Sequence, residues 1–442
     1  MDSLVYVVRA LIGVFGILGI AYFFSSDRRN INWRVVAGGL VLQLAIAAGV
    51  LLVPTVESLF GLIAKMFAIA LEISVKAAGF VFGPLSDITQ MNGAFGANKG
   101  FVFAFMALPS ILFFSALSSL LYYFGVLQFV VKKMAWVMSR VMRLSGAESL
   151  AAAANVFVGQ TEAPLIVKPY IPKMTRSEIL ALMVGGMATI AGSVFAIYMF
   201  MLGGADEQSR IEFGKFLLCA SVMNAPAALL IAKVLLPETQ KVSKDLSVSR
   251  ESIGRNPIDA LANGTSQGLQ LALNVGAMLI AFYAVIMLAN EILSGIGNVP
   301  WFGSGNLNDW IRDVSASQFE RLSLETLFGL IFAPVAWLIG VSGEETLRVG
   351  QLIGIKIFAT EFFAYDKLAE MKAAGLSTRS VFLSTFALCG FANFMSIGIQ
   401  IGGIGSLAPE RRSDLATLGV KALIGGTLAS LLSACIAGMF YS

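Results

Sequence analysis

The sequence predicts an all-α integral membrane protein, with eight transmembrane helices plus two re-entrant hairpins in an inverted repeat, and with discontinuous helices. Composition is the first observation: 57% of the 442 residues are hydrophobic and 13% are charged, about half the charged share of a soluble domain. The second is a set of long charge-free runs. The third is a pair of similar segments with ionisable residues inside apolar sequence. A soluble fold of this size cannot bury so many apolar residues.

Eight charge-free runs are long enough to cross a bilayer, which takes roughly 20 apolar residues and at least about 17. These predicted spans are Ala10–Ser26, Val35–Val56, Phe101–Val131, Ile179–Ala205, Phe216–Ala232, Ala260–Asn290, Val381–Pro409 and Ala422–Ser442. A further run, Thr326–Gly343, is close to the lower limit. We predict that it lies against the membrane or the helix bundle, because a ninth crossing would disturb the charge pattern of the loops.

Basic residues in the loops predict the orientation of the chain. The loops after the first, third, fifth and seventh spans are basic, and they contain Arg28 and Arg29, Lys132 and Lys133, Lys241 and Arg255, and Arg411 and Arg412. The loop at Gly203–Gly214 is acidic. Lys and Arg are enriched in cytoplasmic loops. The four basic loops are therefore predicted to face the cytoplasm, and both termini the outside of a plasma (inner) membrane.

Two apolar segments carry too many ionisable residues to be simple spans. They are Ala147–Pro172, which three prolines interrupt, and Val349–Leu368. Irregular backbone is tolerated at membrane depth where protein surrounds it, so each segment is predicted to form a re-entrant hairpin. A third segment, Glu57–Phe82, has charges spaced among apolar residues and is predicted to be an interfacial amphipathic helix.

Short sequence matches relate the two predicted hairpins. The matched pairs are Ser145–Leu150 with Ser342–Leu347, Thr161-Glu162 with Thr360-Glu361, and Thr175–Ser177 with Thr378–Ser380. Their order is the same and their spacing is nearly constant, at about 200 residues. Three spans lie between the hairpins, and because that number is odd, the second repeat is predicted to be inverted. Inverted repeats with such hairpins are typical of secondary transporters.

The repeat divides the chain into four predicted parts. These are residues 1–130, scaffold helices with the interfacial helix; 131–236, the first inverted repeat, with a hairpin and two spans; 237–321, a scaffold helix and loops; and 322–442, the second inverted repeat. The two repeats are predicted to form the transport domain. Small and polar residues at Thr189–Ser193 and at Gly390–Ser396 predict a helix break in the span after each hairpin.

Polar side chains at the hairpin tips and in the second break mark the predicted binding site. Buried polar groups are costly without partners, so their presence in apolar sequence needs an explanation. An amide both donates and accepts hydrogen bonds, which suits a nucleobase or a sugar, and a carboxylate accepts from two neighbouring hydroxyls. The candidates are Gln160, Thr161 and Glu162 in the first tip, Glu361 in the second tip, and Asn393 and Ser396 in the break, beside Phe391.

Each candidate also has a structural explanation. The polar residues of the first tip could cap the ends of their own helices. Glu361 could form an ion pair with Lys356, five residues earlier in the sequence. Asn393 and Ser396 share a helix face and could form hydrogen bonds to a neighbouring helix. The small residues in the breaks could serve merely to let helices pack closely.

Several functional classes are excluded by composition. The chain has no His, which excludes Ser-His hydrolases and His-ligated metal sites. Cys219, Cys389 and Cys435 lie in apolar runs without metal-binding spacing. The net charge of +4 contains no Lys/Arg block, so no nucleic-acid partner is predicted. No arginine cluster accompanies the polar candidates, which favours an uncharged polar substrate.

The chain resembles the concentrative nucleoside transporter family from about Gly79 onward. The motifs that carry the resemblance are Phe80–Leu85, Leu108–Leu117, Gly159–Glu162, Ala272–Ile280, Gly354–Tyr365 and Cys389–Phe394. Three positions depart from the usual family pattern: Thr360, Phe363 and Met395 replace Asn, Val and Ser. Glu361 keeps its place in the motif.

The resemblance implies a homotrimer in the lipid membrane, in which each protomer is a Na+-coupled or H+-coupled nucleoside symporter and not an enzyme. It implies that Gln160, Thr161, Glu162 and Val194 face the base of uridine or a similar nucleoside. It assigns the ribose to Glu361, Asn393 and Ser396, with Phe391 nearby, and the coupling Na+ to Asn155, Val158, Thr189 and Ile190. Proton-coupled members tend to have Ser in place of Thr161, which favours Na+.

Three alternatives compete with a sodium symporter. One is a proton symporter in which Glu361 or Glu162 titrates during transport. The second is an intramembrane enzyme, which would return a changed product. The third is a channel, which the predicted broken inverted repeats disfavour.

Overall fold

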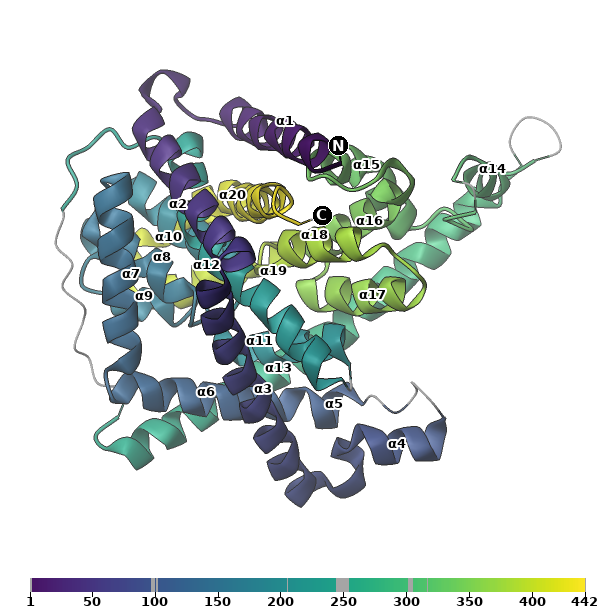
Figure 1. The fold of residues 1–442 in the computed structure, drawn as a ribbon, viewed down its shortest axis with the longest axis horizontal. Helices are drawn as coiled ribbons and strands as arrows, with labels where there is room; N and C mark the ends of the chain where they lie inside the picture. The colour runs from purple at the N-terminus through teal and green to yellow at the C-terminus, as the bar shows by residue number, and fades with distance from the viewer. Residues whose placement is uncertain are drawn as a thin grey trace.

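The computed structural model describes residues 2–96, 100, 102–204, 206–243, 254–300, 305–315 and 317–441. Helices make up most of this part of the chain (Figure 1), which confirms the all-α fold class. Eight stretches within it are long and apolar enough to cross a membrane: Val5–Phe23, Trp33–Leu52, Pro54–Phe95, Phe103–Tyr123, Arg176–Gly203, Glu207–Leu235, Pro257–Gly297 and Pro409–Ala437. Seven of these overlap predicted spans.

The remaining predicted span, Val381–Pro409, is a broken helix. It consists of α18 (Thr378–Leu388) and α19 (Phe394–Leu407). The predicted span Ile179–Ala205 is broken in the same way, into α10 (Arg176–Ala188) and α11 (Gly192–Gly203). Both breaks fall in the predicted segments, so the prediction of discontinuous helices is confirmed.

The N-terminal third begins with three long helices and continues with three shorter ones. They are α1 (Asp2–Phe23), α2 (Trp33–Leu52), α3 (Pro54–Phe82), α4 (Ile88–Phe95), α5 (Phe103–Met106) and α6 (Leu108–Tyr123). α3 covers the segment predicted to lie at the membrane interface. Its length and hydropathy also satisfy the criterion for a span, so its interfacial position stays a prediction.

The first repeat contains α7 (Val126–Met142), α8 (Gly146–Asn155) and α9 (Ala163–Ile166), followed by α10, α11 and α12 (Glu207–Leu235). The second contains α15 (Leu324–Leu338), α16 (Thr346–Phe358) and α17 (Glu361–Ala373), followed by α18, α19 and α20 (Arg412–Ala437). In each repeat two helices are joined by a short tip where the hairpin is predicted. Entry of these hairpins into the membrane stays a prediction.

α15 covers most of the run Thr326–Gly343, which was predicted not to cross the membrane. It is shorter than the candidate spans and packs against α16, which agrees with a helix that lies against the bundle.

Two helices outside the repeats, α13 (Pro257–Gly297) and α6, pack along each other. α13 is the longest helix, and its Asn256 cap accepts a hydrogen bond from Asp259 N (2.9 Å). In Figure 1, α13 begins near α6 at the lower left and rises behind other helices toward the next helix, α14 (Leu307–Val314), at the upper right. Small residues permit the contact with α6, because a Cβ added to Gly264 or Gly268 would lie within 3 Å of α6 atoms.

Three of the four basic loops meet at one end of the molecule. Hydrogen bonds join them from Ser26 N to Leu235 O (2.9 Å), from Ser177 Oγ to Leu236 O (2.7 Å) and from Gly146 N to Ser243 O (3.0 Å). The loops after the first, third and fifth spans therefore lie on one side, as the charge pattern predicts.

α20 links this end to the opposite one. Asp414, in its first turn, pairs with Arg176 at the start of α10 (3.2 Å). Gly438, just after its last turn, accepts a hydrogen bond from Arg379 at the start of α18 (3.0 Å). A helix of 26 residues is about 39 Å long. α10 and α18 therefore start at opposite ends, which agrees with an inverted repeat. Arg379 also stacks on Tyr6 of α1 (3.8 Å), and Figure 1 marks both termini in this region.

Candidate functional site

The two helix breaks touch each other near the centre of the repeats. Gly390, in the second break, has φ +124°, and a Cβ added there would lie 2.4 Å from the carbonyl oxygen of Ala188, the last residue of α10. Only glycine satisfies both the backbone conformation and this approach. Asn224 of α12 donates to Ala188 O (2.7 Å) and to Cys389 O (3.1 Å). One side chain therefore binds the ends of both first half-helices.

A chain of buried hydrogen bonds connects the first hairpin tip to the second break. Gln160 Nε2 donates to Ser396 Oγ (3.1 Å), and Gln400 Nε2 donates to Gln160 Oε1 (3.0 Å). Ser396 N in turn donates to Asn393 Oδ1 (2.8 Å), which caps α19. The predicted residues Gln160, Asn393 and Ser396 are thus brought together from the two repeats.

The same chain continues to the second hairpin tip. Asn393 Nδ2 donates to Glu361 Oε2 (3.0 Å), and Tyr198 OH donates to Glu361 Oε1 (3.0 Å). Glu361 is 2% exposed, so both carboxylate oxygens are held by neutral donors inside protein. A carboxylate in such a position is a strong acceptor for hydroxyl groups.

The alternative in which Glu361 pairs with Lys356 is wrong in this structure. The ammonium of Lys356 donates to Ala387 O (2.9 Å) and to Ser430 Oγ (2.9 Å), and no ion pair with Glu361 is formed. The two residues lie on different helices, because α16 ends at Phe358 and α17 begins at Glu361. The break between them turns the side chains in different directions.

The other predicted substrate residues lie around this chain without being part of it. Glu162 bonds back to the backbone N–H of Gly159, within its own tip, as the capping alternative expected. Thr161 is exposed and lies beside Gly403. Val194 is buried at the start of α11, and Phe391 is half-buried in the second break.

A cavity of about 400 Å³ opens beside the first tip, within the range of about 300–1,000 Å³ typical of small-molecule sites. Val158 and Glu162 line it from the tip, and Ser193 from the start of α11. The opposite wall consists of polar residues of α6 and α13: Ser115, Ser118, Ser119, Asn263, Ser266 and Gln267. The cavity therefore lies between the first repeat and these two helices.

The predicted ion ligands gather where the first tip meets the first break. Gly192 N donates to Phe157 O (3.0 Å), which joins the two segments. Asn155, at the end of α8, is fully buried, and neither atom of its amide has a hydrogen-bond partner among the described residues. That amide lies against Gly185, whose carbonyl accepts a hydrogen bond from Thr189 Oγ1 (2.9 Å).

This arrangement suits a monovalent cation held by neutral oxygens. An unpaired buried amide is costly, and its oxygen would be satisfied by an ion. Thr189 Oγ1 keeps an acceptor lone pair, and Val158 and Ile190 lie outside the helices, in the tip and in the break. No cluster of acidic or Cys residues suited to a transition metal exists in the described chain.

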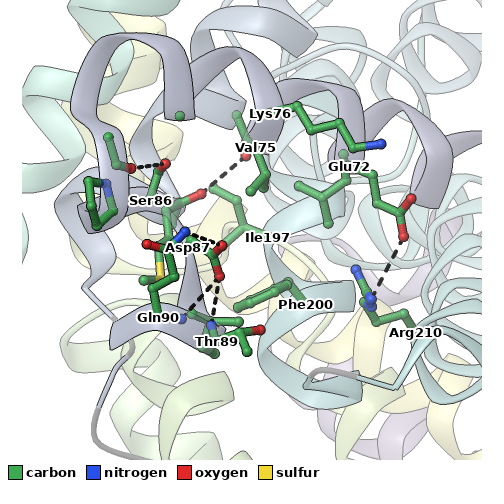
Figure 2. Close-up of a pocket in the computed structure, with 18 residues that line it drawn as sticks. Glu72, Val75, Lys76, Ser86, Asp87, Thr89, Gln90, Ile197, Phe200 and Arg210 are labelled. Carbon is green, nitrogen blue, oxygen red and sulfur yellow. Dashed lines mark hydrogen bonds and ion pairs between the residues drawn. The ribbon is translucent and has the colours of Figure 1, made fainter. Parts of the chain in front are cut away.

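A second cavity, of about 560 Å³, lies on another face of α11 (Figure 2). Ile197 and Phe200 line it, whereas Tyr198 points to Glu361. Its polar groups are engaged with one another: Asp87 caps α4 by accepting from Thr89 N (2.8 Å), and Arg210 lies 3.9 Å from Glu72. These groups do not converge on a common point, so this cavity is a weaker candidate for a site.

Three residues of the centre were missed by sequence reasoning. Tyr198, Asn224 and Gln400 each stand alone in a long span, without a polar neighbour that would draw attention. Gln400 carried the clearest signal, as a lone amide in the apolar stretch Phe394–Leu407. Thr360, which departs from the family pattern, is buried with Oγ1 lacking a partner in the described structure.

Comparison with known proteins agrees with this architecture. Family models described as Na+ dependent nucleoside transporter N-terminus, nucleoside recognition, and Na+ dependent nucleoside transporter C-terminus match residues 12–85, 104–205 and 216–438. An uncharacterized transporter of Haemophilus influenzae is 44% identical, and the alignment covers 98% of each chain. The nucleoside permease NupC of Helicobacter pylori is 37% identical, over 98% of this chain and 97% of its own.

Solved structures of CNTnw have the same fold. Its inward-facing, substrate-bound state is 41% identical to this chain, with a TM-score of 0.87, covering 98% of this chain and 99% of its own. A variant in an outward-facing state is 40% identical, with a TM-score of 0.89, and covers 99% of both chains.

Proposed function

The chain belongs to the family of Na+-dependent nucleoside transporters, and on this basis we propose that it is a sodium-coupled symporter that imports nucleosides by alternating access. Its relatives were solved in inward-facing and outward-facing states, which supports alternating access for this chain. The integral membrane class also follows from its long apolar helices.

The observation that carries the proposal is the hydrogen-bonded chain from Gln160 through Ser396 and Asn393 to Glu361. It joins the two repeats through groups that donate and accept, and a nucleoside offers matching groups on its base and its sugar. We assign the base to Gln160 and its neighbours Thr161, Glu162 and Val194. We assign the ribose to Glu361, Asn393 and Ser396, with Phe391 as an apolar neighbour.

We assign the coupling Na+ to Asn155, Val158, Thr189 and Ile190. The unpaired amide of Asn155 supports this assignment. Sodium held by carbonyls of unwound backbone is a recurring arrangement in secondary transporters. Because the ion site is built from the same hairpin tip that carries Gln160, binding of Na+ would order the tip before the nucleoside binds.

The direct test is uptake of labelled uridine into proteoliposomes with and without an inward sodium gradient. Accumulation that requires the gradient supports the proposal, and equal uptake when choline replaces Na+ at fixed pH contradicts sodium coupling. Uptake that then follows an inward proton gradient would establish the second candidate, a proton symporter. The burial of Glu361 supports this second candidate, because a carboxyl group inside the protein can bind and release a proton during transport.

Two further assignments concern the setting of the protein. We propose that it forms a homotrimer in the inner membrane, with both termini outside. Large apolar side chains such as Ile280, Val285 and Leu288 are exposed along α13. This surface suits contact with other protomers or with lipid, which supports the assignment. Mass measurement of the protein in detergent would reveal the number of protomers.

A further inference from the structure

Gln400 is a buried amide that belongs to the hydrogen-bonded chain but not to the set of proposed substrate residues. It lies in α19, one turn after Ser396, and is fully buried. Its Nε2 donates to Gln160 Oε1 and to Met183 O, both at 3.0 Å, whereas its Oε1 has no partner among the described residues. An acceptor left unsatisfied inside a protein is costly, so packing alone does not account for this side chain.

The backbone of α10 sets the direction of the Gln400 amide. A peptide carbonyl only accepts hydrogen bonds, so Met183 O requires the nitrogen of Gln400 and would repel its oxygen. The same nitrogen faces Gln160, which must then present its Oε1. Gly186 leaves the space for this contact, because a Cβ there would lie 2.7 Å from Gln400 Nε2 and 2.9 Å from Gln160 Cβ. Gln400 therefore prevents the Gln160 amide from turning over.

The fixed amide of Gln160 lies along the first turns of α19. Its Nε2 donates to Ser396 Oγ (3.1 Å), and its Oε1 accepts from Gln400. These two partners are four residues apart, on one helix face and about 6 Å apart along the axis. Asn393, the cap of α19, donates to Glu361, so the proposed ribose site lies at the N-terminal end of this helix. The nitrogen of Gln160 therefore points toward the ribose site, and its oxygen points away from it.

The Gln160 amide can still bind a base. Its nitrogen has a second hydrogen, and its oxygen has a second lone pair. At the end far from the sugar, cytosine and adenine carry an amino group, next to a ring nitrogen that accepts. Uracil and hypoxanthine carry a carbonyl oxygen there, next to a ring N–H. An amide oxygen on the far side and an amide nitrogen nearer the ribose match the first kind of edge and oppose the second at both positions.

We propose that Gln400 is a positioning residue for base selectivity. It holds the Gln160 amide in one orientation, so that the site prefers the amino nucleosides cytidine and adenosine over the keto nucleosides uridine and inosine. This inference rests on the proposed nucleoside transport and on the assignment of the base to Gln160. Uridine remains a substrate, of lower affinity, because its ribose contacts are unchanged. Without the amide of Gln400, the Gln160 amide is free to turn over and to bind either kind of edge.

The test is the affinity of the purified, full-length protein for the four nucleosides in saturating sodium, measured by titration. We expect wild type to bind cytidine about tenfold more tightly than uridine, and adenosine about tenfold more tightly than inosine, or roughly 1.4 kcal/mol. Gln400→Met keeps the length of the side chain and removes the donor. Both ratios should then fall below about threefold, because uridine and inosine bind more tightly. A merely structural defect would weaken all four nucleosides alike.

Gln43→Met is the matched control for this substitution. Gln43 is also fully buried, donates to Ser433 Oγ (3.0 Å), and has an Oε1 without a partner in the described part of the chain. It lies in α2, outside the hydrogen-bonded chain, so both ratios should keep their wild-type values.

A measurement on wild type alone covers a Gln400→Met protein that does not fold. The riboside of pyrimidin-2-one is cytidine without its amino group. It should bind about tenfold more weakly than cytidine, because the bond to Gln160 Oε1 is lost. Equal binding of this riboside and cytidine overturns the inference.

The other outcomes separate this inference from the proposed function. Absence of sodium-driven nucleoside uptake by wild type overturns the proposed function. Sodium-driven uptake with equal affinities for amino and keto nucleosides, or with tighter binding of the keto nucleosides, overturns only the inference. So does a preference that persists unchanged in Gln400→Met, because the orientation of the Gln160 amide would then not depend on Gln400.

Discussion

Glu361 is held from two sides, by Tyr198 of the first repeat and by Asn393 of the second break, and both bonds are 3.0 Å long. Hydrogen bonds to a charged acceptor contribute about 1.5–3 kcal/mol. Glu361→Gln keeps the shape of the side chain and removes the charge. We expect uridine binding to weaken by at least about tenfold, or roughly 1.4 kcal/mol, measured by titration of the purified protein.

Two controls isolate the contact with the sugar. A uridine analogue that lacks the ribose hydroxyl bound by Glu361 should lose less affinity on the substitution, since wild type already lacks that bond. Glu370→Gln removes a charge from the exposed face of the same helix, where Glu370 pairs with Lys367 (2.7 Å), and should leave binding unchanged. Equal losses for uridine and the analogue would refute the ribose assignment.

Thr189 tests the ion site in the same manner. Thr189→Val should raise the sodium concentration for half-maximal uptake by about fivefold, as expected for the loss of about 1 kcal/mol, while uptake in saturating sodium stays near wild type. Thr385→Val is the matched control, because Thr385 is also buried and donates to a carbonyl four residues earlier (2.8 Å). A mutant that keeps its sodium dependence but loses affinity for nucleoside would contradict the assignment.

At this scale the sequence predicted the polar residues that occur in groups. Gln160, Asn393, Ser396 and Glu361 were each expected in the site, and hydrogen bonds link them. The direction of a side chain at a helix break depends on the backbone of the whole hairpin. For this reason the spacing of Lys356 and Glu361 could not decide between a pair and separate partners. Lone polar residues such as Asn224 were missed because their partners are distant in sequence.

Between helices, the crossing of the two breaks depends on one glycine. Gly390→Ala would place a methyl group 2.4 Å from Ala188 O, at a positive φ that L residues rarely adopt. We expect the free energy of unfolding to fall by about 3 kcal/mol, at the upper end of what overpacked cores lose. The measurements are the unfolding temperature and the rate of uptake, both of which should drop markedly.

Gly398→Ala is the control for this change. Gly398 belongs to α19, and a Cβ added there meets nothing within 4 Å, so the unfolding temperature should stay the same or rise slightly. Similar stability of Gly390→Ala and Gly398→Ala would indicate that the two breaks separate more easily than their contacts suggest.

Elements were predictable where composition or repetition marks them. Long apolar runs identified seven of the candidate spans, the matched segments located the two pairs of helices joined by a tip, and small and polar residues after them located both breaks. α3 was harder, because Lys65, Glu72 and Lys76 in an apolar helix are compatible with the interface and with the interior of a bundle. Short helices such as α4 and α14 have no periodic pattern long enough to be recognised.

For the whole molecule, the contacts between loops predict which positions are reachable from each side. The three native cysteines are buried, so they should not react with a membrane-impermeant thiol reagent. Labelling then reports only on a cysteine introduced by substitution. Ser139→Cys, on α7 in the basic region after the third span, should react only from the cytoplasmic side. Ala374→Cys, in the turn before α18, should react only from outside. Labelling of both from one side would contradict the orientation.

The crossing held by Asn224 and Gly390 also determines how many parts of the protein can move separately. Ala188 and Cys389 are bound by the same amide, so the two breaks keep their mutual positions during any displacement of the repeats. The proposed ion ligand Thr189 lies in the first break, the proposed ion ligand Asn155 lies against Gly185 just before it, and the proposed sugar acceptor Glu361 accepts a hydrogen bond from Asn393 in the second break. The nucleoside and the Na+ would then move together, bound to one rigid part of the protein. Their coupling would not require a conformational change transmitted between separate sites.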